Sequence, residues 1–346
     1  MADTLRRRGY RVDIEELDPS FPHPTPAALD QADRALAAVC TGAIAIVDSL
    51  ALGAMPDLIV REASRLRIVA LMHLPLAATA GLDRDTAARF EEGERRALGA
   101  ASLVVVTGKA ALPLVARYDV PPDRMAVVEP GTDPAPLARG SHGPAEAGHH
   151  VLAQSYVASG FSRTSTELLC VGTLNATKGH EMLLEALAAV PQQNWHLTCA
   201  GSPTRDLATA ARVQTAIAKL GLAERVTLAG DLDRYALEAC YDRADLFVLA
   251  TRQETYGMAV AEALAHGLPV VATMTGAIPE LVGSDAGLLV PAGDRTMLMN
   301  ALTRVLTDAS LRARLAEGAR RVRVRLPTWN QAAHGMAAAL ASLGDL

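Results

Sequence analysis

The chain has 346 residues, 50% of them hydrophobic, which is enough to bury two domain cores. Its 33 basic and 38 acidic residues nearly cancel, to a net charge of −5, and only 3% of the residues are aromatic. This balance argues against a nucleic-acid-binding surface, which needs basic groups and aromatic stacking platforms. No apolar stretch is long enough to span a bilayer, and the N-terminus lacks the apolar core of a signal peptide, so we expect a cytoplasmic protein.

In the N-terminal half, short apolar runs alternate with amphipathic helical patterns. The expected strands cover residues 11–17, 43–47, 67–72, 102–106 and 125–128. Helices are expected between them, for example over residues 83–99 and 109–118. Strands separated by helices of this length predict a parallel sheet with helices on both faces.

A Gly-, Ala- and His-rich stretch over residues 140–166 interrupts the pattern and is typical of a linker or surface insertion. His149 and His150 lie in it, but two adjacent histidines do not easily face one ion, so we predict no metal there.

The second half repeats the alternation, with expected strands over residues 168–171, 196–200, 225–229, 245–250, 269–272 and 287–290. Pro327 marks a new helix start. The resulting domains are 1–139, the linker 140–166, a second domain 167–325, and a C-terminal helix 326–346 that packs back on the first domain.

We expect structural roles for the cysteines and for the clusters of basic residues. The four cysteines, Cys40, Cys170, Cys199 and Cys240, show no CxxC spacing, and we interpret Cys170 and Cys199 as small core residues. The basic clusters at residues 6–8 and 312–325 favour solvated helix faces over a membrane-surface patch.

The most informative segment runs from Glu254 to Glu262. It follows the apolar strand at 245–250, and Gly257 opens the helix that carries Glu262. Chance alone supplies about four acidic pairs at this spacing, so the setting carries the argument. A carboxylate in a loop, a second on a helix and free N–H groups between them suit a ligand with hydroxyls and phosphates.

A second element begins the same domain. The strand ends at Gly172, where a missing Cβ lets backbone approach a ligand, and Thr173 follows. The loop then places Lys178 just before a helix over residues 180–189. Ligands of open α/β sheets collect at the carboxyl ends of strands, so we expect Lys178 and Glu254 to converge.

Together, the segments 171–179 and 244–248, Gly201 and the Glu254–Glu262 block resemble family 4 of the retaining glycosyltransferases. The resemblance covers nearly the whole chain and is strongest from about residue 168 to 325. It implies the α/β GT-B fold, with two facing Rossmann-like domains, parallel sheets and a cleft between the domains. The implied activity is transfer of a hexose from a nucleotide-diphosphate sugar to a hydroxyl acceptor, which could be a lipid, a glycan or a small molecule.

The resemblance also implies roles for individual residues. Glu262 holds the ribose hydroxyls, Glu254 approaches the transferred sugar, and Lys178 neutralises the diphosphate. The N–H groups of Met258 and Ala259 meet the sugar or phosphate, with Gly257 leaving room. Gly172 and Thr173 complete the phosphate side, and Tyr256 lies near the sugar. No cofactor or metal is expected beyond the donor substrate.

His73 is the candidate from the first domain. In the family, a histidine at this strand end faces the transferred sugar, although the match could instead fall on Met72. A histidine that only satisfies loop backbone is an equal alternative. Thr107, Gly108, Asp48 and Ser49 are weaker candidates, and His180 and His266 at helix ends are expected to be structural.

Two departures bear on activity. The family commonly has Arg at Thr173, and a lost cation on the leaving group costs roughly 3–4 kcal/mol. The family also opens with a strand and a glycine-rich loop, whereas this chain begins within the following helix, at residues 3–9. Two alternatives therefore stand beside the enzyme: a truncated, non-catalytic remnant that still binds nucleotide sugar, and a nucleotide-sugar epimerase of the same fold. Peripheral contact with the inner membrane face is a further expectation from the family.

Overall fold

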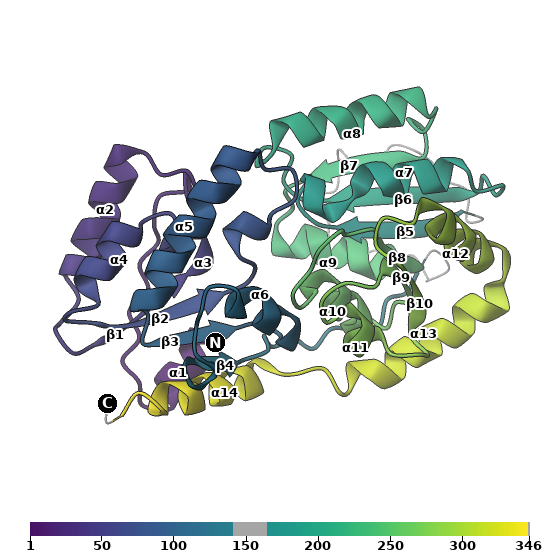
Figure 1. The fold of residues 1–346 in the computed structure, drawn as a ribbon. Helices are drawn as coiled ribbons and strands as arrows, with labels where there is room; N and C mark the ends of the chain where they lie inside the picture. The colour runs from purple at the N-terminus through teal and green to yellow at the C-terminus, as the bar shows by residue number, and fades with distance from the viewer. Residues whose placement is uncertain (141–164, 345–346) are drawn as a thin grey trace. The chain divides into compact units, whose positions relative to one another are not determined.

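The computed structural model describes residues 1–140 and 165–344 (Figure 1). They form two compact units. Unit 1 consists of Met1–Thr132, Glu254–Tyr256 and Pro327–Leu346, and unit 2 of Asp133–Gln253 and Gly257–Leu326. Most of the expected insertion, including His149 and His150, lies outside the described residues.

Unit 1 is built on a parallel sheet in the order β1-β2-β3-β4. Its strands are β1 (Ile44–Asp48), β2 (Arg67–Met72), β3 (Leu103–Val106) and β4 (Met125–Val127). Its α-helices are α1 (Ala2–Arg7), α2 (Pro26–Ala37), α3 (Ser49–Leu52), α4 (Pro56–Glu62), α5 (Arg84–Ala100), α6 (Leu112–Ala116) and α14 (Trp329–Ala341). Short 3-10 turns are η1 (Leu76–Ala78), η2 (Lys109–Ala111) and η3 (Pro122–Arg124).

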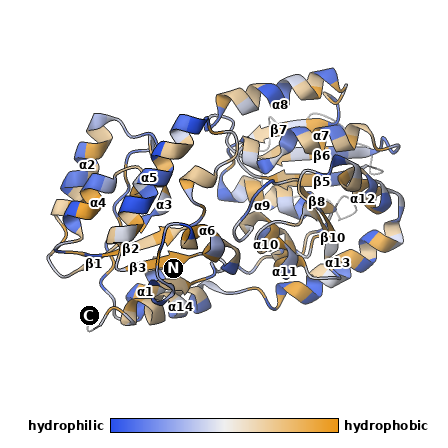
Figure 2. Cartoon of the chain, viewed as in Figure 1, coloured by the Kyte–Doolittle hydropathy of each residue, from blue (hydrophilic) through white to orange (hydrophobic). Residues whose placement is uncertain are grey.

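The sheet of unit 1 is covered on both faces because alternate residues of its strands point to opposite sides. Ile68, Ala70 and Met72 of β2 join a core with α2, α4 and α5, whereas Val69 joins a second core with α1 and α14. The hydropathy colouring shows β2 and β3 as apolar strands beneath helices with polar outer faces (Figure 2). The C-terminal helix therefore belongs to the packing of unit 1.

The expected strand at residues 11–17 is wrong, because this segment has no regular structure. Its apolar residues alternate with Asp13, Glu15 and Glu16, and Ile14 is 63% exposed. Strand formation is stabilised by packing of the side chains, and an exposed apolar side chain does not provide it. Within residues 109–118, Pro113 lies in the first turn of α6, and the expected single helix is split into η2 and α6.

Unit 2 has a six-stranded parallel sheet in the order β10-β9-β8-β5-β6-β7. Its strands are β5 (Thr166–Val171), β6 (Trp195–Ala200), β7 (Val226–Gly230), β8 (Leu246–Leu249), β9 (Val270–Thr273) and β10 (Gly287–Val290). Its helices are η4 (Ala176–Lys178), α7 (His180–Ala188), α8 (Leu207–Lys219), α9 (Arg234–Arg243), α10 (Met258–Ala265), α11 (Ile278–Val282), α12 (Arg295–Thr307) and α13 (Ala309–Arg323).

The strand order of unit 2 reverses between β5 and β8. From β5 the chain runs outward through β6 and β7, and then returns to place β8 on the other side of β5. Open α/β sheets bind ligands at the carboxyl ends of the strands where the order reverses. The loops after β5 and β8 are the two loops at this point, and they carry Lys178 and Glu254 respectively.

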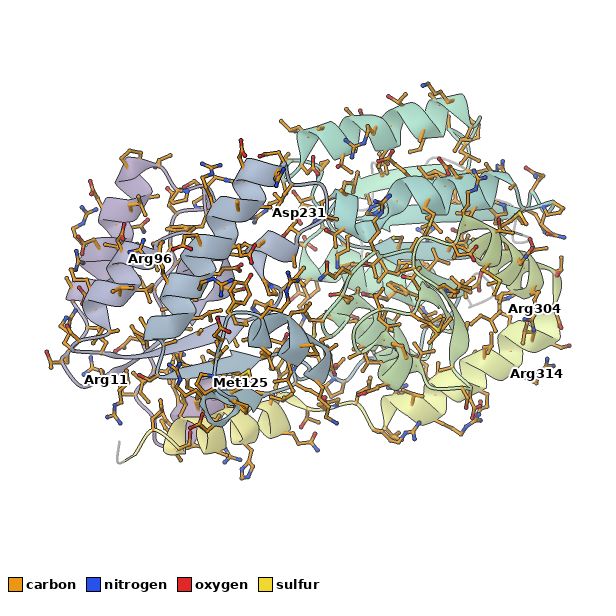
Figure 3. All side chains as sticks on the ribbon, in the orientation of Figure 1. Arg11, Arg96, Met125, Asp231, Arg304 and Arg314 are labelled. Carbon is orange, nitrogen blue, oxygen red and sulfur yellow. The ribbon has the colours of Figure 1, made fainter. Side chains whose placement is uncertain are left out.

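Arginines of α12 and α13, the arginine-rich helices of unit 2, make local contacts or extend outward from the helices (Figure 3). Arg320 pairs with Glu317 at 3.3 Å, and Arg312 donates to the carbonyl of Val305 at 2.7 Å. Arg304 and Arg314 extend outward from α12 and α13 (Figure 3). Among the described residues, no helix combines the length and the apolar character that a bilayer crossing requires.

Candidate functional site

The loop after β5 brings the Lys178 side chain over Gly172. A Cβ built on Gly172 would lie 3.3 Å from Cγ and Cδ of Lys178, so the lysine stem rests where another residue would have its side chain. The Oδ1 atom of Asn175 accepts from the Lys178 N–H at 3.1 Å and fixes the turn η4. Thr173, which follows Gly172, is half-buried. The sequence motif thus folds into a short, well-defined loop.

This loop is bonded to the end of β8. The Thr177 carbonyl accepts from the Arg252 N–H at 2.7 Å and from the Thr251 hydroxyl at 3.1 Å. Gly179 has φ 69°, and a Cβ there would lie 2.1 Å from the Ala250 carbonyl oxygen. Only glycine fits this close approach. The Lys178 loop is therefore fixed to the segment that leads directly into Glu254.

The start of α10 presents backbone donors. Gly257 has φ 97° and precedes the helix without a capping side chain. Its carbonyl accepts from Val260 at 2.9 Å and Ala261 at 3.0 Å. Met258 and Ala259 are the first two residues of the helix, so their N–H groups have no acceptor inside it. This is the arrangement that attracts anions to a helix N-terminus.

Glu262 lies half-buried on the second turn of α10. The Tyr241 hydroxyl on α9 donates to its Oε2 atom at 2.8 Å. Burial raises the pKa of Glu262, the hydrogen bond from Tyr241 lowers it, and the nearby charges of Glu238 and Asp133 raise it again. The net pKa is above the usual value. Sequence reasoning missed Tyr241, because nothing in the local pattern of α9 points to a residue 21 positions further on.

Glu254, Thr255 and Tyr256 pack with unit 1, although the residues on either side belong to unit 2. A Cβ on Gly108 would lie 3.0 Å from the Thr255 carbonyl oxygen. Glu254 is half-buried, whereas Tyr256 is only 3% exposed. Burial, followed by the charge of Glu129, raises the pKa of Tyr256 to about 12. Tyr256 is therefore a packed residue, while Glu254 keeps part of its surface accessible.

His73 lies at the carboxyl edge of the sheet in unit 1, directly after β2. Its Nε2 atom is 2.9 Å from Oδ2 of Asp48, and its backbone N–H donates to the Ser49 hydroxyl at 3.4 Å. Met72 is fully buried at the end of β2, whereas the His73 side chain is 52% exposed. Of Met72 and His73, only His73 is exposed enough to contact a ligand. The weaker candidates Asp48 and Ser49 are its hydrogen-bond partners.

The surroundings of Asp48 favour the ionised form of its carboxyl group. Burial would raise the pKa of its carboxyl group, but hydrogen bonds from His73 and from the Leu50 N–H outweigh it, and the pKa is lowered. The second bond also makes Asp48 the cap of α3. A charged carboxylate thus faces the imidazole.

A buried carboxylate supports the loop that follows His73. Glu94 on α5 is 0% exposed and accepts from the N–H of Leu76 at 2.5 Å, the N–H of Ala77 at 3.3 Å and the hydroxyl of Tyr118 at 2.6 Å. Burial nevertheless raises the pKa of Glu94. The helical pattern of α5 does not distinguish Glu94 from the exposed acidic residues beside it, so this role could not be predicted from the sequence.

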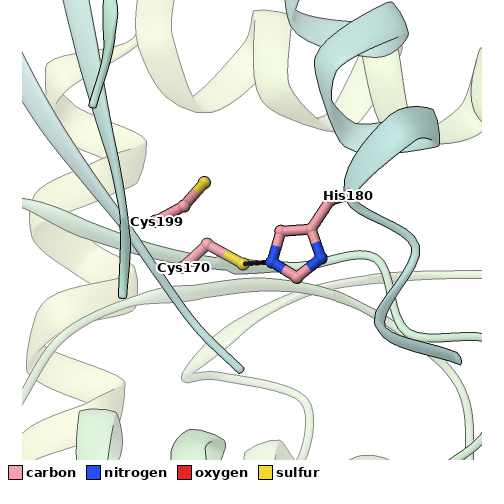
Figure 4. A group of neighbouring side chains, drawn as sticks. All are labelled: Cys170, His180 and Cys199. Carbon is pink, nitrogen blue, oxygen red and sulfur yellow. Dashed lines mark hydrogen bonds between the residues drawn. The ribbon is translucent and has the colours of Figure 1, made fainter. Parts of the chain in front are cut away.

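Cys170, Cys199 and His180 form the group that could hold a soft metal ion, since their ligand atoms lie within 4.8 Å of one another (Figure 4). Cys170 and Cys199 are neighbours across β5 and β6, and the Cys170 sulfur is 3.8 Å from Nε2 of His180. The hydrogen bond from Cys199, and then His180, holds the pKa of the Cys170 thiol low despite burial.

Two observations argue against a metal centre in this group. No further His, Cys, Asp or Glu joins it within residues 1–140 and 165–344. The Nδ1 atom of His180 is buried without a hydrogen-bond partner, whereas metal-bound histidines use this nitrogen to fix the ring. We assign the three side chains to the packing of β5, β6 and α7.

The sequence of the chain resembles known glycosyltransferases. The family model described as "Glycosyl transferases group 1" matches residues 157–322. D-inositol 3-phosphate glycosyltransferase of Salinispora arenicola is 32% identical over 255 residues, which are 70% of this chain and 55% of the relative. The protein of the same name from Corynebacterium efficiens is 30% identical over 222 residues, 63% of this chain and 51% of the relative. The chain thus spans about half the length of these curated relatives.

The fold resembles solved glycosyltransferase structures. Sucrose-phosphate synthase from Thermosynechococcus elongatus superposes with a TM-score of 0.76 at 21% identity, covering 99% of this chain and 91% of that one. Anabaena HepE in complex with UDP and glucose gives 0.72 at 18% identity, covering 91% and 81%. The expected α/β GT-B class, with parallel sheets in two Rossmann-like units, is confirmed. Residues 157–322, which hold β5–β10, carry the sequence signature of the group 1 glycosyl transferases within a chain of GT-B fold.

Proposed function

We propose that the chain is a retaining glycosyltransferase of family 4 type, which moves a hexose from a nucleotide-diphosphate sugar to a hydroxyl acceptor. The observation that carries the proposal is the grouping at the strand-order reversal of unit 2. There the Lys178 loop, the start of α10 and the Glu262 carboxylate supply a cation, backbone donors and a hydroxyl acceptor. These match the diphosphate and the ribose of one nucleotide.

In this proposal unit 2 binds the donor, and His73 with Glu254 serves the sugar and acceptor side. As the sugar–phosphate bond breaks, the diphosphate gains charge and the ring becomes cationic. Lys178 and the N–H groups of Met258 and Ala259 stabilise the departing oxygens without reorganising. Retention follows from attack on the same face, with the leaving phosphate taking the acceptor proton. No nucleophilic carboxylate and no metal is required in this scheme.

The relatives guide the choice of substrates. HepE has been solved with UDP and glucose, so UDP-sugars are the first donors to assay, followed by GDP- and ADP-sugars. The names of the sequence relatives make D-inositol 3-phosphate the first acceptor to assay, before glycans and lipids.

The test combines binding and turnover. Calorimetry with UDP, GDP and ADP should show binding, and transfer should fall strongly in Glu254→Ala and Lys178→Ala. Unchanged transfer in both variants rejects the assignment. Thermal stabilisation by a nucleotide sugar without transfer to any acceptor would instead indicate a binding remnant. An isomerised nucleotide sugar formed without acceptor would indicate an epimerase.

A further inference from the structure

We propose that Tyr241 is a positioning residue, which orients the Glu262 carboxylate toward the two ribose hydroxyls of the nucleotide. This inference rests on the proposed function and adds to it a residue outside the family-like motifs. Its starting point is the 2.8 Å hydrogen bond from the Tyr241 hydroxyl to Oε2 of Glu262, which joins α9 to α10.

Tyr241 is itself held rigidly. Its side chain is 2% exposed, and its ring stacks on His266 at 4.8 Å between centroids, with 9° between the planes. Phe247 lies 6.4 Å from the same ring at 21°. His266 caps the end of α10, and its Nε2 atom lies 3.3 Å from the Glu238 carboxylate on α9. The stacked rings and the His266–Glu238 pair therefore both link α9 to α10, and the packed Tyr241 ring leaves its hydroxyl little freedom of direction.

The hydrogen bond leaves the carboxylate with the acceptors that a diol needs. The Oε1 atom of Glu262 accepts no hydrogen bond from any residue that the structure describes. Each carboxylate oxygen has two lone pairs, so Oε2 keeps one beside Tyr241. One ribose hydroxyl can donate to Oε1 and the neighbouring hydroxyl to the open side of Oε2.

The same hydrogen bond helps to keep Glu262 charged. Three titratable groups act on the pKa of this carboxylate, namely Tyr241 and Glu238 on α9 and Asp133 before β5, and His266 at the end of α10 stacks on the Tyr241 ring. Burial, Glu238 and Asp133 all raise the pKa of Glu262, while burial lowers that of His266 and favours its neutral form. Tyr241 alone among them lowers the pKa of Glu262. Without the Tyr241 hydrogen bond, the pKa of Glu262 would be raised further.

The test compares ribose with deoxyribose in the full chain. UDP, GDP and ADP, each with its 2′,3′-dideoxy analogue, are titrated into wild type, Tyr241→Phe, Glu262→Gln and the double variant. Tyr241→Phe should weaken binding of the ribonucleotide about tenfold and leave the dideoxy analogue unchanged. In the double variant Tyr241→Phe should add little to the loss from Glu262→Gln. Tyr118→Phe, which removes a hydroxyl from a buried carboxylate of unit 1, is the matched control and should not change the ratio.

A pH series gives a second readout. Ribonucleotide affinity should fall as the pH drops through the pKa of Glu262, and this fall should begin at a higher pH in Tyr241→Phe. Glu262→Gln should show no such fall in affinity, because its side chain does not titrate. Equal losses for ribose and dideoxyribose in Tyr241→Phe, or an unshifted pH profile, overturn the positioning role while the nucleotide site stands. A wild-type chain that binds none of the three nucleotides overturns the proposed function and this inference together.

Discussion

The Nε2 atom of His73 lies 2.9 Å from Oδ2 of Asp48, which joins the residue after β2 to the last residue of β1. The two strands are neighbours in register, with Asp48 opposite Leu71, so the sheet itself sets this distance. The pair gives the exposed imidazole a fixed orientation. An oriented histidine is what the proposed sugar-side role requires, and it makes that role testable through its partner.

Asp48→Asn should lower kcat/KM for transfer about tenfold, with nucleotide affinity unchanged. The asparagine oxygen can still cap α3, so the main change is the charge that faces His73. The pKa of Asp48 is lowered, so its ionised form stabilises the fold above the usual carboxyl pKa, and this contribution is lost as the pH falls through the folded value. Because Asp48 stays ionised from pH 6 to 8, steady-state kinetics in this range measure the loss of its charge.

Asp83→Asn is the control for the Asp48 prediction, because Asp83 also caps a helix of unit 1 but has no histidine partner. A full rate in Asp48→Asn together with a full rate in His73→Ala would remove both residues from the mechanism.

Lys178→Ala should reduce kcat/KM by about 100- to 1,000-fold, the usual result of losing one stabiliser of a leaving oxyanion. The chain should stay folded, because the lysine stem lies over Gly172 rather than in the core. Lys219→Ala, at an exposed position at the end of α8, should keep the wild-type rate. Equal rates in the two lysine variants would exclude Lys178 from the chemistry.

Two glycines of the Lys178 loop should respond differently to alanine. Gly179 has φ 69°, and a Cβ would collide with the Ala250 carbonyl at 2.1 Å, so Gly179→Ala should cost 2 kcal/mol or more, to order of magnitude, in unfolding free energy. The atoms nearest to a Cβ on Gly172 belong to the flexible Lys178 stem, at 3.3 Å.

Gly172→Ala should therefore cost less than about 1 kcal/mol in stability yet impair donor binding, because Lys178 must move aside. Urea denaturation and nucleotide titration of both variants give the comparison. Equal stability losses would show that the Gly172 side of the loop is as rigid as the Gly179 side.

Tyr118→Phe should destabilise the chain by about 1–3 kcal/mol at neutral pH, because Glu94 is left buried with one donor fewer. The folded pKa of Glu94 is raised, so the protonated form stabilises the fold at low pH, and this contribution is lost as the pH rises through the folded value. The Tyr118 hydrogen bond limits that loss. The penalty of the variant should thus shrink as the pH falls and Glu94 takes up a proton.

Denaturation curves from pH 4 to 8 measure this penalty, and Tyr235→Phe, at a side chain 86% exposed, is the control. A penalty that does not vary with pH would mean that Glu94 does not titrate in this range.

The sequence by itself determined the parallel α/β alternation, the glycines at Gly172 and Gly179, and the order of Lys178, Glu254 and Glu262. These are local properties: the period of apolar residues, and turns that only glycine can form. The same local pattern was wrong at residues 11–17, where propensity had no packing to support it.

Only the tertiary structure decided which distant side chains meet. The pairing of Tyr241 with Glu262, of Asp48 with His73, and of Glu94 with Leu76 joins residues on different elements. The tertiary structure also buries Tyr256, which the family resemblance had placed near the sugar. The physical reason is that these distances depend on strand order and helix packing, which a local pattern of residue types does not specify.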